Sequence, residues 1–335
     1  MKDLLGVEDE PAPEGPATEE PGNTPYAAKG VPVAGAEGIT NIKSKFGVAK
    51  TGAEGVKEAF LELGAFIQNG GLETDAAITN QYKRVIQLGD WIALEGGLEV
   101  KPYGAGGVDK TGYFEYSPDD QYWNKPIPEG TYQGKLNQLI VVGINSFNEV
   151  NDNDTPHVVF QFQHIPVKRR MNTTGINTGG YPASEMREYL VPVTREDQLV
   201  EGSGNFLAGL IKAGVPEGVL WGPARVMATK SDPPTETITD LLWLPTEWEM
   251  FGTQDSSINV ENAQNQARLE YYVTPTFRRK GNPSIMPGMI NYWLASATTN
   301  SGNFCAVDSS AGSNATASTA HGVAPAFCVQ GWIQQ

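Results

Sequence analysis

The chain has 335 residues, of which 39% are hydrophobic and 19% are charged, so it is long enough to bury a substantial core. Its 38 glycines and 23 prolines favour many short strands joined by long connections over a helical bundle. The formal net charge of -15 argues against a nucleic-acid partner, because phosphate contacts need clustered lysines and arginines. Two basic clusters, residues 168–170 and 278–280, are predicted to be solvated strand ends.

The N-terminal segment, residues 1–45, is predicted to be an acidic tail rich in proline and glycine. Residues 7–25 contain no aromatic residue and bury too little apolar area to offset the entropy cost of ordering them. We interpret this tail as a candidate anchor in an assembly. No signal-peptide pattern follows Met1, and the apolar runs are too short to span a bilayer. We therefore expect synthesis in the cytoplasm and no membrane span.

Residues 46–82 are predicted to form a helical connector. Thr51 and Glu54 have the spacing of a capping box, and Gly70 ends the helix. The apolar positions between them recur at intervals of four, three and four residues: Val56, Phe60, Leu63 and Ile67. This apolar stripe is compatible with sealing a domain core and with forming an oligomer seam.

From residue 83 onward the pattern predicts one folded body. Strands are expected at residues 85–88, 92–94, 135–142 and 157–164, and short helices at residues 184–190 and 205–212. Residues 242–252 are typical of a strand followed by a capped helix, in which Thr246 and Glu249 form a capping box. Residues 292–296 and 322–329 are strand-like.

No catalytic or metal site is predicted, and we expect no cofactor. His157 and His164 lie seven residues apart in one predicted strand, on opposite faces, so they cannot share a zinc ion. There is no Gly-x-Ser-x-Gly motif and no phosphate loop. Cys305 and Cys328 are expected to be reduced core thiols, with a disulfide as the alternative if their strands pair.

The C-terminal half carries motifs that resemble a known fold family. The run Leu244-Pro245-Thr246-Glu247-Trp248-Glu249 looks like a signature of the formylglycine-generating-enzyme branch of the C-type lectin fold. Residues 142–147, 156–163 and 184–190 are similar to an uncharacterised family of bacterial and prophage proteins. The resemblance covers roughly residues 83–335 and implies an α+β, C-type-lectin-like domain. The resemblance implies that four residues are characteristic of this fold: Trp243, Glu247, Trp248 and Glu249. We call them the fold signature.

The chain also resembles the variable proteins of diversity-generating retroelements, which include phage tropism determinants. In those proteins the C-terminal region of this fold displays hypervariable residues that contact ligands. The resemblance implies a ligand- or receptor-binding display protein on a phage particle or a bacterial surface. Its expected partners are a host-surface receptor, either protein or glycan, and other virion proteins that contact the N-terminal region. We also expect a homo-oligomer.

Two alternatives remain beside the display protein. Enzymes of the formylglycine-generating branch use two closely spaced cysteines to bind copper and activate oxygen. Cys305 and Cys328 are 23 residues apart and strand-embedded, a departure that argues against an oxidase and against enzymatic activity in general. The second alternative is a purely structural virion decoration protein, which would lack a ligand.

The candidate display region is residues 293–321, which are dominated by Ser, Thr, Asn, Asp, Gly and Ala. Such residues cannot build a core, so most are expected to face solvent. The region is therefore either a polar loop without a specific role or a tolerant binding surface on a rigid scaffold. Trp293 is expected at the base of this region. The predicted ligand-contacting residues are Trp293, Thr298, Asn300, Asn303, Asp308, Ser310, Asn314, Thr316 and Thr319.

Overall fold

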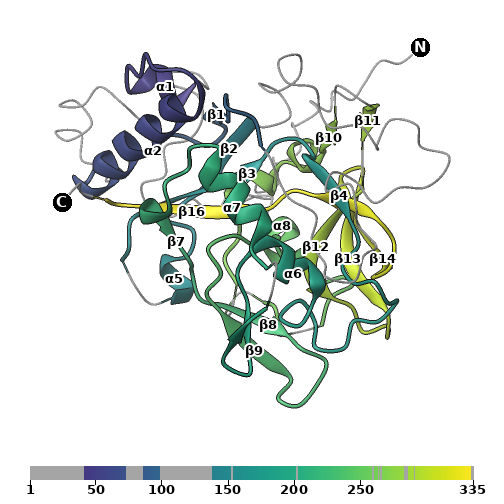
Figure 1. The fold of residues 1–335 in the computed structure, drawn as a ribbon. Helices are drawn as coiled ribbons and strands as arrows, with labels where there is room; N and C mark the ends of the chain where they lie inside the picture. Colours follow the sequence, from purple (N-terminus) through teal and green to yellow (C-terminus); the bar gives the residue numbers. More distant parts are fainter. Residues whose placement is uncertain are drawn as a thin grey trace, which may run out of the picture.

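The computed structural model describes residues 41–72, 86–98, 138–151, 154–200, 203–258, 260–262, 264, 266–282, 286–289 and 291–332. Within these residues the fold is α+β, built from two five-stranded sheets with short helices around them (Figure 1). The predicted tail up to residue 40 lies outside the described residues. No helix in the described part of the chain is long and apolar enough to cross a membrane.

The first sheet is antiparallel throughout and has the strand order β1-β2-β3-β16-β7. Its strands are β1 (Trp91–Ala93), β2 (Gln138–Ile144), β3 (His157–Phe162), β16 (Ala326–Gln330) and β7 (Leu220–Trp221). All six residues of β3 are buried, so side chains on both faces of this strand are covered. The strand predicted at 157–164 is confirmed over residues 157–162, and its apolar and polar positions are both buried because the two faces of β3 are covered.

The second sheet has the order β14-β13-β12-β15-β4 and is mixed, because β12 and β15 run parallel. Its strands are β14 (Ala311–Thr316), β13 (Asn303–Asp308), β12 (Tyr292–Ala297), β15 (His321–Val323) and β4 (Val167–Arg169). β14 forms one edge of this sheet. Only two residues separate β15 from β16, so the chain passes directly from the second sheet into the first, where β16 lies between β3 and β7.

The remaining elements are helices, 3₁₀ turns and two-stranded ribbons. The helices are α1 (Ile42–Lys45), α2 (Gly52–Gln68), α5 (Asn148–Asn151), α6 (Glu185–Leu190), α7 (Asn205–Lys212) and α8 (Glu247–Phe251), with 3₁₀ turns η1 (Glu217–Val219), η2 (Glu270–Val273) and η3 (Pro275–Arg278). The two-stranded ribbons are β5 (Thr194–Arg195) with β6 (Gln198–Leu199), β8 (Arg225–Ala228) with β9 (Thr235–Ile238), and β10 (Gly281–Asn282) with β11 (Met286–Met289).

Helix α2 seals the core of this body. Its predicted stripe is buried, and the ring of Phe60 lies 5.5 Å from that of Phe160 on β3 and 6.2 Å from that of Phe327 on β16. The helix therefore packs against the first sheet as part of one hydrophobic core, which is the first of the two roles expected for its apolar stripe. The physical reason is that the apolar stripe needs the first sheet to cover it.

The predicted tail also ends earlier than residue 45. Ile42 is 1% exposed, and the ammonium groups of Lys43 and Lys45 lie 2.6 Å from Glu95 and 2.5 Å from Asp90. Residues 41–45 are thus packed against β1 and the turn that follows it. The folded body begins by residue 41.

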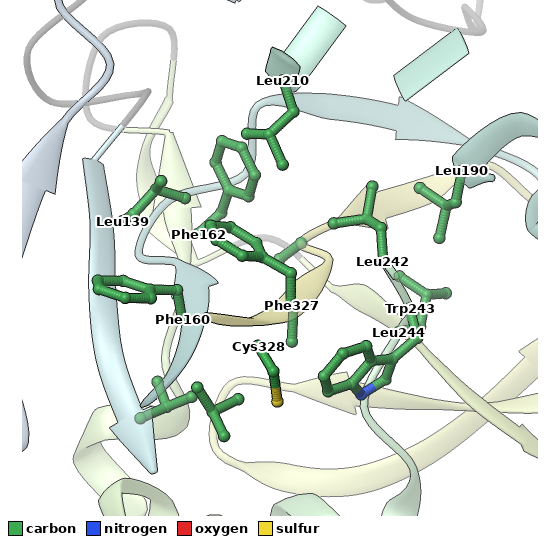
Figure 2. Packing of buried hydrophobic residues seen from close by; sticks show 14 of the residues in the cluster. Leu139, Phe160, Phe162, Leu190, Leu210, Leu242, Trp243, Leu244, Phe327 and Cys328 are labelled. Atoms are coloured by element: carbon green, nitrogen blue, oxygen red, sulfur yellow. The ribbon is translucent and has the colours of Figure 1, made fainter. Parts of the chain in front are cut away.

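One hydrophobic cluster runs through the whole body. Figure 2 shows Phe160, Phe162 and Phe327 near one another, while the side chain of Cys328 points the other way across β16, toward the indole of Trp243. Trp243 pairs with Ala326 at an isolated bridge, which ties the segment before α8 to the central strand. The core therefore joins the C-terminal strand to the fold signature.

The local predictions had mixed outcomes. The helices at 184–190 and 205–212 and the capping box of Thr246 and Glu249 are confirmed. The strand predicted at residues 85–88 is wrong, because residues 86–90 form a turn in which Asp90 accepts a hydrogen bond from Gln87 N at 2.9 Å. Thr51 precedes α2 as predicted, but its side chain makes no capping hydrogen bond.

The prediction that the basic cluster at 278–280 is solvated is wrong for Lys280. Lys280 is 2% exposed, and its ammonium group donates to the carbonyl oxygen of Phe162 at 2.6 Å and to the hydroxyl of Tyr272 at 3.0 Å. Burial lowers the pKa of Lys280 to about 7. This lysine therefore joins the first sheet to η2 instead of lying in solvent.

Candidate binding surface

The candidate surface rests on β12, whose six residues are all buried. The indole Nε1 of Trp293 donates to the carbonyl oxygen of Arg169 at 2.8 Å, and the Trp293 ring lies 4.6 Å from that of His321. Burial lowers the pKa of His321 to about 4, so the imidazole against this indole is neutral at pH 7. Trp293 thus supports the surface from below and is covered from solvent.

The turn after β12 is held by a buried amide from a distant segment. The Nδ2 group of Asn177 donates to the carbonyl oxygens of Thr298, Asn300 and Asn303, at 3.3, 2.9 and 2.6 Å. Asn177 is 1% exposed, so these contacts are shielded from competing water. The backbone from residue 298 to residue 303 is therefore fixed from its inner side.

A lysine holds the same turn from outside. The ammonium group of Lys230 donates to the carbonyl oxygens of Thr299 and Asn300, at 3.1 and 2.8 Å. Lys230 itself has a positive φ of 56°, an uncommon conformation for a residue with a β-carbon. Asn177 and Lys230 together direct five donor contacts at the turn formed by residues 298–303.

Strands β13 and β14 form a hairpin that displays small polar side chains. Residue pairs run from Asn303 with Thr316 to Asp308 with Ala311. Asn303 Nδ2 donates to Asn314 Oδ1 at 2.8 Å across the hairpin. Asn314 and Thr316 are exposed, while Phe304 on β13 is buried. The hairpin therefore combines a buried inner strand with an exposed edge strand.

The segment before α6 packs against this end of the hairpin. The carbonyl oxygen of Ala317 accepts hydrogen bonds from Met171 N and Asn172 N, at 3.0 and 3.1 Å. A β-carbon on Gly302 would lie 2.4 Å from the carbonyl oxygen of Gly175, so only glycine allows this approach. The neighbouring side chain of Ile176 is 52% exposed. It adds an apolar group to an otherwise polar surface.

We name these residues the hairpin surface. It comprises residues 173–176 together with Asn300, Asn303, Asn314, Thr316 and Thr319. Thr319 joins the set because its amide donates to the carbonyl oxygen of Thr316 at 2.8 Å in the turn that follows β14.

The predicted site residues fall into three groups. Asn300, Asn314, Thr316 and Thr319 are exposed and Asn303 is half-buried, all at one end of the hairpin. Asp308 and Ser310 lie at its other end, roughly 17 Å away at the rise of an extended strand. Trp293 and Thr298 are 0% and 2% exposed, so neither side chain reaches a ligand in solution.

The display region at 293–321 is largely regular structure. Strands were expected at β12 and β13, whereas β14 and the start of β15 stand where a polar loop was weighed. Asn177, Lys230, Gly175 and Ile176 were not predicted. The contacts that recruit Asn177 span more than 120 residues of sequence, so no local pattern indicates them. The composition of residues 172–178, Asn-Thr-Thr-Gly-Ile-Asn-Thr, is the one available signal, because it matches that of the hairpin.

The fold signature lies beneath the hairpin. The amide of Glu247 donates to Ser296 Oγ at 2.8 Å, and that hydroxyl donates to the carboxyl group of Glu261. Glu247 accepts in turn from the amide of Ser257 at 2.7 Å. Glu247 is 2% exposed, so it positions α8 and β12 instead of contacting a ligand.

A buried ion pair completes this support. Arg225 on β8 binds Glu249 through two hydrogen bonds of 2.8 and 2.9 Å, and its guanidinium group lies 5.1 Å from the centre of the Trp243 ring. Glu249 also accepts from the amide of Thr246 at 2.8 Å. Trp248 differs from the other signature residues, because it is half-buried and lines a cavity.

The two cysteines are free and buried, on strands of different sheets. Burial raises the pKa of both thiols, and the neighbouring carboxylates Glu247 and Glu249 add to the effect at Cys305 and Cys328 respectively. Thiols of raised pKa are poor nucleophiles and poor metal ligands. Among the described residues, no group of three or more His, Cys, Asp and Glu side chains is placed to hold a metal ion.

Comparison with known proteins adds no further identification. No protein-family model matches the sequence, and neither the curated proteins nor the solved structures gave a match.

Proposed function

We propose that the protein is a ligand- or receptor-binding display protein, and that the hairpin surface makes the contact. The observation that carries this proposal is the set of hydrogen bonds by which Asn177 and Lys230 hold the turn at 298–303. We call this set the clamp. A fixed backbone that carries small, exposed polar side chains loses little conformational entropy when it binds a partner. A loop without a specific role has no need of such a clamp.

The exposed side chains support a tolerant surface. Asn314, Thr316 and Thr319 point away from the core, so their exchange leaves the packing of β12 and β13 unchanged. Ile176 provides an apolar contact beside them. We propose a host-surface protein or glycan as the partner, since amides and hydroxyls can donate and accept hydrogen bonds with either.

We further propose that residues 83–335 adopt a C-type-lectin-like fold of the kind found in variable proteins of diversity-generating retroelements, with α1 and α2 packed onto it. The support is the sequence resemblance together with the burial of Trp243, Glu247 and Glu249. A near-copy template repeat beside the gene is the expected genomic sign of diversification. Its absence would contradict the retroelement origin and leave the binding role untouched.

Attachment to a phage particle or bacterial surface is the second half of the proposal. In Figure 1, α1 and α2 lie at one end of the molecule and β13 and β14 at the other. An N-terminal region that joins other virion proteins would leave the hairpin surface facing outward. This polarity favours a display protein over a decoration protein without a ligand.

The cysteine oxidase is the weaker alternative. Cys305 and Cys328 are buried on different sheets and have raised pKa values, which disfavours copper binding by a thiolate pair. Copper loading with cysteine-dependent oxygen uptake would favour the oxidase over the display protein.

The experiment compares two threonines substituted in the same way. Thr316→Arg places a long cation on the hairpin surface, and Thr237→Arg places the same side chain on exposed β9. Labelled protein is incubated with cells of the strain that carries the gene and with related strains. We expect Thr316→Arg to abolish or redirect cell binding while Thr237→Arg binds like the parent. Equal binding by all three proteins would contradict the proposal.

A further inference from the structure

A cavity separate from the hairpin surface opens between the end of β2 and α8. It has a volume of about 350 Å³, and its walls include Ser146, Val150, Trp248, Arg268 and Glu270. None of these residues belongs to the hairpin surface. A cavity of this size is within the range that holds a small organic molecule.

The polar wall contains a carboxyl group in a constrained position. Ser146 Oγ donates to Glu270 Oε2 at 2.8 Å. A β-carbon on Gly143 would lie 2.2 Å from Ser146 Oγ and 3.1 Å from Glu270 Oε2, and Gly143 stands where the register of β2 and β3 shifts. The backbone irregularity and the glycine therefore create the room that this pair occupies.

A guanidinium group lies in the same cavity. Arg268 Nη1 donates to the carbonyl oxygen of Phe251, and Arg268 Nε is buried without a hydrogen-bond partner. Arg268 and Glu270 influence each other electrostatically but form no ion pair. An unsatisfied buried donor on a charged group costs free energy, which an acceptor on a ligand would recover.

The remaining wall is apolar or aromatic. Trp248, Val150 and Ala267 line the cavity beside the two charged groups. A simple anion would be repelled by the carboxylates of Glu149 and Glu270, which line the same cavity. A simple cation would be repelled by the guanidinium group of Arg268. A molecule that carries both charges and an apolar side chain matches all three kinds of wall.

We propose that this cavity binds a small zwitterion, an α-amino acid with an apolar side chain. Its carboxylate contacts Arg268, its ammonium group contacts Glu270, and its side chain packs against Trp248. Burial raises the pKa of Glu270 to about 7 in the empty cavity, and a bound ammonium group favours the charged carboxylate. Binding therefore strengthens as the pH rises from about 6 to about 8.

Titration calorimetry with the full chain tests the proposal, with L-leucine and L-phenylalanine as probes. Each amino acid should bind, and blocking either the amine by acetylation or the carboxylate by amidation should weaken binding by about tenfold or more. Methyl glucoside serves as a polar molecule without charge and should not bind. The proposal is overturned if neither amino acid binds at millimolar concentration, if blocked and free forms bind equally, or if only the glucoside binds.

Two variants locate the site. Glu270→Gln should weaken binding of the free amino acid about tenfold or more and should remove the rise of affinity with pH. Glu217→Gln on exposed η1 makes the same chemical change elsewhere and should bind like the parent. If Glu270→Gln binds as tightly as Glu217→Gln, with the same pH dependence as the parent, the assignment to this cavity is wrong.

Discussion

Asn177 is the residue on which the geometry of the hairpin surface depends most directly. Replacing it by alanine leaves the carbonyl oxygens of Thr298, Asn300 and Asn303 without their common donor. We expect Asn177→Ala to lower the free energy of unfolding by about 1–3 kcal/mol, the cost of losing buried hydrogen bonds to this turn. Chemical denaturation measures this loss.

Amide hydrogen exchange gives the local counterpart of the same prediction. Exchange of residues 298–303 should accelerate in Asn177→Ala before that of β12 does. Asn300→Ala is the matched control, because its exposed side chain should contribute less than about 0.5 kcal/mol. Equal stability of the two variants would contradict the clamp.

Glu261 predicts a pH dependence of stability. It is fully buried, and burial raises its pKa from 4.5 to about 7, against the hydrogen bonds from Ser296 and Ala228 and the charge of Arg225. The folded state therefore binds a proton more readily than the unfolded state between pH 4.5 and pH 7. The stability that the protonated group contributes is full below pH 4.5 and is lost as the pH rises to 7.

Glu261→Gln isolates this contribution. Burial lowers the pKa of His157 and His321 to about 4, so these residues act in the opposite direction and destabilise the fold as the pH falls from 6.5 to 4. We compare the free energy of unfolding of the variant with that of the parent at each pH. The difference, variant minus parent, should be about 1–3 kcal/mol larger at pH 8 than at pH 5. Denaturation of both proteins at the two pH values provides the measurement, and a difference that is the same at both would contradict the prediction.

At the level of elements, the ion pair of Arg225 and Glu249 joins β8 to α8. Arg225→Met leaves the buried carboxylate uncompensated, and we expect a loss of about 3–5 kcal/mol of stability. The exposed pair of Lys50 and Glu58 on α2 is the control, since Lys50→Met should cost at most about 1 kcal/mol. Similar losses in the two variants would show that the buried pair does not hold the two elements together.

The elements that sequence predicted well are those with local signals. α6 and α7 follow from apolar spacing and end residues, and α8 follows from the capping box of Thr246 and Glu249. β14 was expected to be loop, because Asn, Ser, Thr and Gly give no apolar alternation on an exposed edge strand, whereas β13 was expected to be strand-like around Cys305. The pairing of β14 with β13 supplies the order that its own composition does not indicate.

The candidate site was predictable only in its C-terminal part. Asn300, Asn314 and Thr316 are identified by composition, but Asn177 and Lys230 come from other parts of the chain. Trp293 is buried under the region, so its side chain is covered from solvent and does not offer the ligand contact that was expected of it. Long-range hydrogen bonds and burial depend on the tertiary fold, and a single sequence does not encode them as a local pattern.

For the whole molecule, residues 41–45 are packed into the folded body. Deleting residues 1–45 removes the buried side chain of Ile42 and the ion pairs of Lys43 and Lys45. We expect this truncation to be less stable than deletion of residues 1–40 by about 2 kcal/mol or more, mainly from Ile42. Thermal denaturation compares the two, and equal stability would contradict the packing of α1.

The same pair of truncations addresses attachment. If the N-terminal region joins other virion proteins, the protein without residues 1–40 should fold and bind cells but should not enter the particle. Incorporation of this truncated protein at the normal level would show that the anchor lies elsewhere.

The central claim is that a rigid scaffold carries a tolerant binding surface. Its most direct test substitutes every amino acid at Asn300, Asn314 and Thr316, with Trp293 as the buried comparison, and measures folding and cell binding for each variant. We predict that most substitutions at the three surface positions preserve folding and change cell binding, whereas substitutions of Trp293 unfold the protein. Preserved folding with unchanged cell binding at all three surface positions would contradict the claim.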